Sequence, residues 1–469
     1  MSIEFYIMRS ILIIFLTSLS VQVWAEFITP DRIKNDVDFW AKVYREWDTH
    51  QAVFYDSKTK AVYDVLDLPL VENELSSARY RKDVEKRLRQ ITHVLKNRSL
   101  ETPPDPLAEK IEDIVKLNGL WAETDLPDRL KVQSGLRRQF ENGLKISGRY
   151  ADDIKAILKA EKLPEDLMAI VFVESLFNLS TVSHAGAVGP WGIVKETALR
   201  SGIHVNNFTD ERLDWVLATY AAAQYLKRAK EGLSEWPLVI TSYNYGYPGM
   251  MRAANTFGKD FEAIYDNHAS PIFGYASKSY YAEFLAALDT LKNQETHFPE
   301  LKKEHRLVYD TVQVQRPVDV LDLKSYSIIK EEDLKRLNPA LTKRTLHGQE
   351  VLPANYALRI PKGQSGRFYQ DLKKIKTEAR QKAAAKISVK YRAKANQTLA
   401  SIAKLFGVSE DYLSKKMNKP LNYKPKGVVL IRSEAHNYSN LLELNKNVLN
   451  NLSSGQQLEK PPEIGVAER

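Results

Sequence analysis

The chain has 469 residues, enough for about three folded domains. Hydrophobic residues make up 43% and charged residues 27%, which excludes a wholly disordered chain. The absence of cysteine excludes disulfide scaffolds, cysteine-ligated metal sites, thiol nucleophiles and a lipid-modified N-terminal cysteine. The net charge of +9 favours a polyanionic partner, such as nucleic acid, anionic lipid or cell-wall polymer, without choosing among them.

The first residues have the features of an export signal. An uncharged apolar run covers residues 11–23, and small residues precede an expected cleavage site after Ala25. This pattern predicts a secretory signal peptide at residues 1–25, which starts at Met1 or Met8. A retained membrane anchor is the alternative, although the run is short for a bilayer span. Export predicts a periplasmic or cell-envelope location, with no stable membrane insertion after cleavage.

The next region is predicted to be helical. Within residues 26–130, Phe39, Trp40 and Val43 recur on one helical face. A second helical run ends near Leu163. Both are interpreted as ordinary packing helices. The N-terminal region carries no recognisable motif, and packing beside the following unit is the role left open for it.

A buried helix with a single carboxylate lies near the middle of the chain. Pro164 and two acidic residues open a helix that apolar residues surround almost completely. Glu174 lies near its end, with Val171 and Phe177 as neighbours on the same face. Poor solvation raises the pKa of a carboxyl group, which favours a general acid at neutral pH. The alternative is a helix-end Glu that only reaches solvent.

A glycine-rich segment follows this helix. Gly186, Gly189 and Gly192 recur every third residue, so the backbone can pass close to a ligand or to a neighbouring helix. Trp191 lies among them and is a candidate for stacking on a sugar ring. A phosphate-binding loop is rejected, because no Lys-Ser/Thr pair follows the glycines.

Tyrosines dominate the last part of this unit. Tyr243 and Asn244 are predicted to lie in a polar loop around Gly246, which suits a carbohydrate-binding cleft. Tyr280 and Tyr281 come before an Ala- and Leu-rich helix. Because adjacent helical residues face different ways, only one of these two tyrosines can point into such a cleft.

These motifs resemble, in order and spacing, the lytic transglycosylase domain, the lysozyme-like family that cleaves murein. The resemblance covers about residues 130–290. It rests on five segments in register: Glu174 to Asn178 (ESLFN), Ser183 to Gly192 (SHAGAVGPWG), Ala222 to Leu226 (AAQYL), Tyr243 to Gly246 (YNYG) and the closing block FGYASKSYYAEFLAA.

The resemblance implies cleavage of the β-1,4 bond between N-acetylmuramic acid and N-acetylglucosamine in peptidoglycan glycan strands, without a cofactor or metal. A 1,6-anhydro sugar is the implied product. Glu174 takes the role of general acid and then base. The implied substrate-binding residues are Ser175, Gly189, Trp191, Gly192, Tyr243, Asn244, Tyr280 and Tyr281. Of the last two, Tyr280 matches the family's cleft tyrosine better by its distance to Leu285, and Tyr281 is the second choice.

One departure from the family pattern keeps other functions open. The family usually has Gln after the Trp of the glycine-rich segment, whereas this chain has Gly192. A peptidoglycan-binding scaffold with little or no activity is therefore one alternative, and a lysozyme-type hydrolase is another. A nucleic-acid binder is disfavoured by the export signal and by the lack of a recognisable nucleic-acid-binding motif.

The C-terminal part has a different rhythm of elements. Residues 303–365 alternate strand, helix and strand, and resemble a degenerate LysM module of D-type murein transglycosylases. Residues 366–386 form a basic linker, and residues 387–435 resemble LysM itself, a module that grips N-acetylglucosamine chains. An unrelated β-α-β packing module is the alternative. Residues 436–469 are predicted to be disordered.

The expected architecture is mainly α. A lysozyme-like catalytic domain at residues 131–295 follows the N-terminal helical region and precedes small α+β LysM-like modules.

Overall fold

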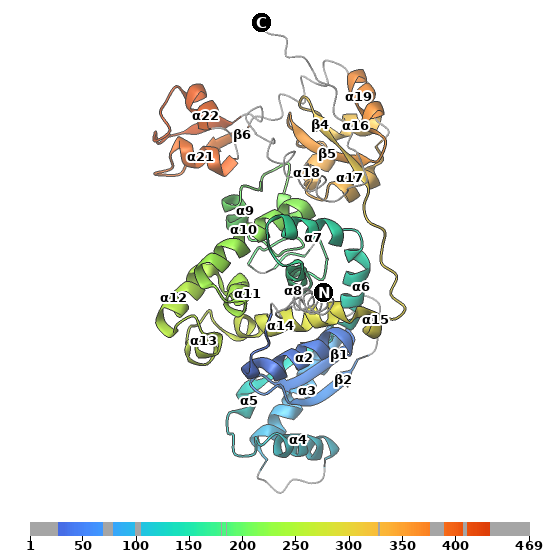
Figure 1. Ribbon diagram of the computed structural model, residues 1–469, viewed down its shortest axis with the longest axis vertical. Coiled ribbons are helices and arrows are strands. Elements are labelled where there is room, and N and C mark those ends of the chain that lie inside the picture. The colour runs from blue at the N-terminus through green and yellow to red at the C-terminus, as the bar shows by residue number, and fades with distance from the viewer. Residues whose placement is uncertain are drawn as a thin grey trace, which may run out of the picture.

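The structure, a computed structural model, is mainly helical, as predicted (Figure 1). It describes residues 27–68, 78–98, 105–179, 181–183, 185–326, 329–375, 389–406 and 410–431. The predicted signal peptide and the predicted disordered tail lie outside the described residues.

The N-terminal region combines helices with a three-stranded antiparallel sheet of order β2-β1-β3. Its elements are η1 (Asp31–Ile33), α2 (Lys34–Arg45), β1 (Gln51–Asp56), β2 (Val62–Asp67), α3 (Ala78–Lys96), α4 (Pro106–Leu117), α5 (Leu126–Arg129) and β3 (Leu130–Ser134). The prediction of a purely helical region is therefore wrong for the strands. The run Gln51–Asp56 is rich in residues that favour strands, and a tight turn lets it pair at once with Val62–Asp67.

The named elements of the central unit are all helices in its described part, and isolated β-bridges join Val188 to Val182 and Ile193. Its elements are α6 (Arg137–Ser147), α7 (Ala151–Ala160), η2 (Glu165–Met168), α8 (Ala169–Glu174), α9 (Lys195–Arg200), η3 (Glu211–Leu213), α10 (Trp215–Leu233), α11 (Trp236–Tyr245), α12 (Tyr247–Phe257), α13 (Phe261–Asn267), α14 (Tyr275–Lys292) and α15 (Gln294–His297). The predicted tyrosine-rich loop is wrong. Tyr243 and Asn244 lie in the last turn of helix α11, and Gly246 separates α11 from α12 with a φ of 90°.

The N-terminal region packs directly against α14, the long helix of the central unit (Figure 1). The ring of Phe27 lies 5.0 Å from that of Phe284. The hydroxyl of Tyr281 donates a hydrogen bond to the backbone oxygen of Ile28 at 2.8 Å. One hydrophobic core continues from α2 through the central unit, so the N-terminal region supports the helix that carries Tyr280.

The next unit has a two-stranded antiparallel sheet of β4 and β5 with helices around it. Its elements are β4 (Tyr309–Val314), α16 (Val320–Tyr326), α17 (Glu331–Leu337), α18 (Lys343–Leu346), β5 (Tyr356–Pro361) and α19 (Ser365–Lys374). Helix α19 occupies the first part of the predicted basic linker. Its Phe368 and Leu372 are buried in the same core, so this stretch belongs to the folded unit.

A buried ion pair joins this unit to the central one. Arg359 of β5 is 3% exposed, and its Nη2 donates to Oδ1 of Asp214 at 3.0 Å. The same carboxylate caps α10 by accepting hydrogen bonds from the backbone amides of Val216 and Leu217. The guanidinium lies 4.3 Å from the centroid of the Trp215 ring. An ion pair to the Asp214 carboxylate at the start of α10 thus joins the two units.

The last described unit is a small sheet of β6 and β7 with two helices between the strands. Its elements are β6 (Val389–Arg392), α21 (Leu399–Phe406), α22 (Glu410–Met417) and β7 (Val428–Ile431). It has its own buried cluster, made of Leu399, Ile402, Ala403, Leu413 and Val429.

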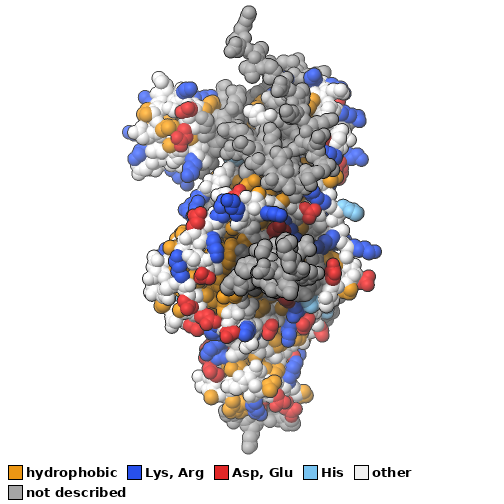
Figure 2. Space-filling model, in the orientation of Figure 1, with side chains coloured by type: hydrophobic (Ala, Val, Ile, Leu, Met, Phe, Trp, Pro, Cys, Tyr) orange, Lys and Arg blue, Asp and Glu red, His pale blue; other side chains and the backbone are white. Residues whose placement is uncertain are grey.

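Charges of both signs are interspersed on the face that Figure 2 shows, rather than gathered in one basic patch. A search of the described residues for a helix both long and apolar enough to cross a bilayer finds none.

Candidate active site

Glu174, the carboxyl group identified from the sequence, lies at the end of helix α8. Glu174 is the last residue of α8, and the backbone turns away at Ser175. The Ser175 hydroxyl donates to the backbone oxygens of Val171, at 3.1 Å, and Pro190, at 2.9 Å. Ser175 is buried and therefore ties the helix end to the glycine-rich segment.

The turn after Glu174 has an unusual backbone. Leu176 and Phe177 both have left-handed φ values, 50° and 58°, which side chains of this size rarely adopt. Phe177 is 1% exposed and its ring packs edge-on against Phe172 at 5.0 Å. Burial of this ring stabilises the strained turn, and the turn ends the helix at the carboxylate.

The Glu174 carboxyl is held by a tyrosine and has little contact with water. Burial raises the pKa of Glu174 to about 7, and the hydrogen bond from Tyr280 acts in the opposite direction. The Tyr280 hydroxyl donates to Oε1 of Glu174 at 2.5 Å. The Tyr243 ring stacks near that of Tyr280 with centroids 6.4 Å apart, and its hydroxyl donates to the Trp191 backbone oxygen at 2.8 Å. With a pKa near 7, about half of such carboxyl groups hold their proton at neutral pH.

Gly192 faces the same carboxyl group directly. A Cβ atom built at Gly192 would collide with Oε2 of Glu174, and the φ of 58° also favours glycine. The Gly189 backbone lies so close to the Arg212 backbone that a side chain would not fit there either. The Arg212 guanidinium donates to the backbone oxygens of Gly186 and Ile193 at 2.9 and 3.2 Å, which fixes the glycine-rich segment beside Glu174.

Two predicted substrate-binding residues are turned elsewhere. Trp191 is completely buried, and its Nε1 donates to the Thr219 hydroxyl at 2.8 Å. The predicted stacking on a sugar is wrong for this structure, because protein covers the whole side chain. Tyr281 is also fully buried and bonds the N-terminal region, so the second choice for the cleft tyrosine is wrong as well.

Asn244 lies at the exposed end of α11. Its side-chain oxygen accepts a hydrogen bond from the Ser277 hydroxyl at 2.7 Å. The structure therefore brings Glu174 together with Ser175, Gly192, Tyr243 and Tyr280, while Asn244 is held by α14.

Sequence reasoning missed a second carboxyl group. Glu283 lies on α14, and burial first, then the charge of Glu174, raises its pKa to about 8. Tyr44 of α2 is buried, and the charges of Glu283 and Glu174 both raise its pKa further. An acidic residue among the Ala and Leu residues of this helix, three residues after Tyr280, was the available signal for Glu283.

No group of three or more potential metal-ligating side chains occurs among the residues that the structure covers. The chemistry that the site offers is proton transfer by a poorly solvated carboxyl group.

Comparison with known families matches residues 153–264 to the transglycosylase SLT domain. Two curated relatives, both membrane-bound lytic murein transglycosylase D, come from Escherichia coli strains K12 and O6:H1. Each is 26% identical over 261 residues, which cover 54% of this chain and 56% of the relative. The chain thus spans about half the length of the curated relatives it matches.

A solved structure of an inactive mutant of the lytic transglycosylase Slt from Pseudomonas aeruginosa also matches. The match is 17% identical in sequence, covers 48% of this chain and 36% of the Slt chain, and has a TM-score of 0.26. The matched domain contains Glu174 and the glycine-rich segment. The chain therefore contains a transglycosylase SLT domain at residues 153–264 and is similar in sequence to two murein transglycosylases.

Proposed function

We propose that this protein is a peptidoglycan lytic transglycosylase of the cell envelope. It cleaves the β-1,4 bond between N-acetylmuramic acid and N-acetylglucosamine and leaves a 1,6-anhydro-N-acetylmuramic acid end. The observation that carries the proposal is Glu174, a carboxyl group in the SLT domain with a pKa raised to about 7. Such a group is protonated enough to act as an acid and acidic enough to return as a base.

The first half of the reaction uses Glu174 as the acid. Its carboxyl proton moves to the bridging oxygen as the bond from that oxygen to the muramyl C1 breaks. The electron pair of the bond leaves with the N-acetylglucosamine oxygen, and positive charge develops at C1. The newly formed Glu174 carboxylate is stabilised by the hydrogen bond from Tyr280.

The second half uses the same residue as the base. The Glu174 carboxylate takes the proton of the muramyl 6-hydroxyl, and that oxygen attacks C1 of its own sugar. The new bond from O6 to C1 closes the anhydro ring, and no water is consumed. An attacking group within the same sugar already has the proximity that catalysis otherwise has to supply.

The C-terminal units are assigned a binding role within this proposal. The accessory unit at 303–365 and the unit at 387–435 hold the enzyme on glycan strands as LysM-like modules. The order of elements in the second unit, with strands outside and helices inside, supports this role.

Digestion of purified murein sacculi tests the main proposal. We expect mass spectrometry to detect muropeptides that end in anhydro-muramic acid. Products with reducing-end muramic acid would instead establish a lysozyme-type hydrolase. Binding of sacculi without any soluble product would establish the scaffold alternative.

Replacement of Gly192 by Ala should reduce the rate by roughly 100-fold, the usual cost of displacing a catalytic group by about 1 Å. The new methyl group would occupy the space of the Glu174 carboxyl oxygen. Gly186→Ala is the matched control, since Gly186 has a φ of 74° but open space around it. Initial rates of muropeptide release measure both variants. Equal rates for the two would contradict the contact between Gly192 and Glu174.

Tyr280→Phe should move the alkaline limb of activity to higher pH by roughly one unit. The Tyr280 hydrogen bond favours the ionised form of Glu174, so its loss raises the pKa of Glu174 further. Activity that needs the protonated acid then persists to higher pH. Tyr281→Phe is the matched control, because its hydroxyl bonds Ile28 instead. The measurement is kcat/KM against pH, and an unmoved limb in Tyr280→Phe would refute the prediction.

A further inference from the structure

Glu283 occupies an unusual position beside the site. It lies on α14 one helical turn after Tyr280, the residue that holds Glu174, so the two share a helix face. The side chain keeps some contact with solvent. Within the part of the chain that the structure describes, no group donates a hydrogen bond to its carboxyl or forms an ion pair with it. A poorly solvated carboxyl group without partners requires an explanation.

The cation within electrostatic reach of Glu283 is already paired elsewhere. Lys60 is 7% exposed, and its Nζ lies 2.7 Å from Oδ1 of Asp36 on α2. The same Nζ donates to the backbone oxygen of Ser57 at 2.6 Å. Lys60 therefore offsets the desolvation of Glu283 only in part and forms no contact with its carboxyl group.

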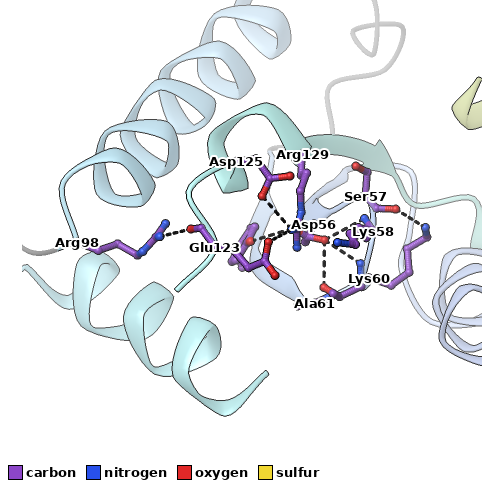
Figure 3. A network of polar contacts seen from close by, with 11 residues as sticks. Asp56, Ser57, Lys58, Lys60, Ala61, Arg98, Glu123, Asp125 and Arg129 are labelled. Carbon is purple, nitrogen blue, oxygen red and sulfur yellow. Dashed lines mark hydrogen bonds and ion pairs between the residues drawn. The ribbon is translucent and has the colours of Figure 1, made fainter. Parts of the chain in front are cut away.

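The turn between β1 and β2 keeps Lys60 in this arrangement (Figure 3). Asp56 accepts hydrogen bonds from the backbone amides of Lys58 and Thr59 at 2.9 and 2.8 Å. Arg129 donates to the other carboxylate oxygen of Asp56 at 2.7 Å. Lys60 itself has a left-handed φ of 63°. The fixed turn leaves Glu283 without a cation partner.

We propose that Glu283 is a second carboxyl group of the active site, which donates a hydrogen bond to an oxygen of the bound glycan strand beside Glu174. The proposal rests on the proposed function for the identity of the ligand. The bound glycan then provides the hydrogen-bond partner that the protein does not provide for Glu283. Glu283 is a substrate-binding residue in this scheme and takes no part as nucleophile or base.

The surroundings of Glu283 favour the neutral, hydrogen-donating form. Burial first, then the charge of Glu174, raises the pKa of Glu283 to about 8, and Lys60 opposes this shift. The charge of Glu283 raises the pKa values of four tyrosines on α2, β1 and α14: Tyr44, Tyr55, Tyr275 and Tyr280. All four tyrosines are uncharged at neutral pH. A neutral neighbour also avoids repulsion when Glu174 loses its proton during the reaction.

Binding of an N-acetylglucosamine tetramer tests the proposal without requiring cleavage. Isothermal titration at pH 7 compares wild type with Glu283→Gln and Glu283→Ala. Gln retains a donor of the same shape, so we expect its affinity within about threefold of wild type, whereas Ala should bind about tenfold more weakly. Glu231→Gln and Glu231→Ala are the controls, since Glu231 is exposed on α10. The LysM-like modules of the proposed function also bind such a chain, so the titrations are fitted with a separate class of sites for them. Equal affinity of wild type and Glu283→Ala at every class of sites would overturn the proposal.

A second measurement decides the matter even if the Ala variant does not fold. Between pH 7 and 9 the wild type should lose affinity as Glu283 ionises, by about tenfold more than Glu283→Gln loses. An identical pH dependence of the two proteins would overturn the proposal, as would a wild type that does not bind the tetramer. A protein that binds through Glu283 but releases no anhydro product would refute the proposed function and leave this inference standing.

Discussion

Replacement of Glu174 by Gln is expected to reduce the release of anhydro-muropeptides by at least about 1,000-fold while murein binding stays unchanged. General acid–base assistance contributes about 100- to 10,000-fold for a proton transfer, and both halves of the proposed reaction use this residue. The amide oxygen of Gln can still accept the hydrogen bond from Tyr280, so the site geometry is retained. What the variant lacks is a proton that can leave and return.

The measurement is the initial rate of muropeptide release from sacculi, together with a sedimentation assay for sacculus binding. Glu231→Gln serves as a control for the loss of one exposed carboxylate on α10. The pH profile adds an independent check. Because the pKa of Glu174 is raised to about 7, wild-type activity should fall as the pH rises above 7 and the acid ionises. Full activity of Glu174→Gln would assign proton transfer to another group.

The site residues that sequence identified most directly are those fixed by local geometry. Glu174 and Ser175 come at the end of a helix, and their neighbours on α8 follow from a 3.6-residue period. Tyr280 was preferred to Tyr281 because it matches the position of the family's cleft tyrosine, and its hydrogen bond to Glu174 agrees with that choice.

What sequence missed depends on contacts between distant segments. The buried Trp191 donates a hydrogen bond to Thr219, which follows 28 residues later, and lies in the core of the central unit. An aromatic residue between glycines gives no sign of which face the core will cover. The closeness of Glu283 to Glu174 and Lys60 depends on the packing of α14 beside α8 and the turn that carries Lys60, which the sequence does not show. The strand Gln51–Asp56 was missed because pairing with Val62–Asp67 and Leu130–Ser134, rather than local period, determines it.

The buried ion pair between the central and accessory units should dominate the stability of their interface. Arg359→Met would leave the Asp214 carboxylate without its cation in a position that is 5% exposed. Removal of one partner of a buried pair costs about 3–5 kcal/mol in the free energy of unfolding. Arg367→Met is the matched control, because the Arg367 side chain is 66% exposed and a surface pair contributes less than about 1 kcal/mol.

A double variant separates the lost charge pair from lost packing. Asn at position 214 would still cap α10 through its side-chain oxygen, which now accepts hydrogen bonds from Val216 and Leu217. Arg359→Met with Asp214→Asn should therefore be more stable than Arg359→Met alone, because the orphaned charge is gone. Denaturant unfolding measures each free energy. If the double variant is the less stable of the two, the charged Asp214 carboxylate stabilises the start of α10 even without its cation partner.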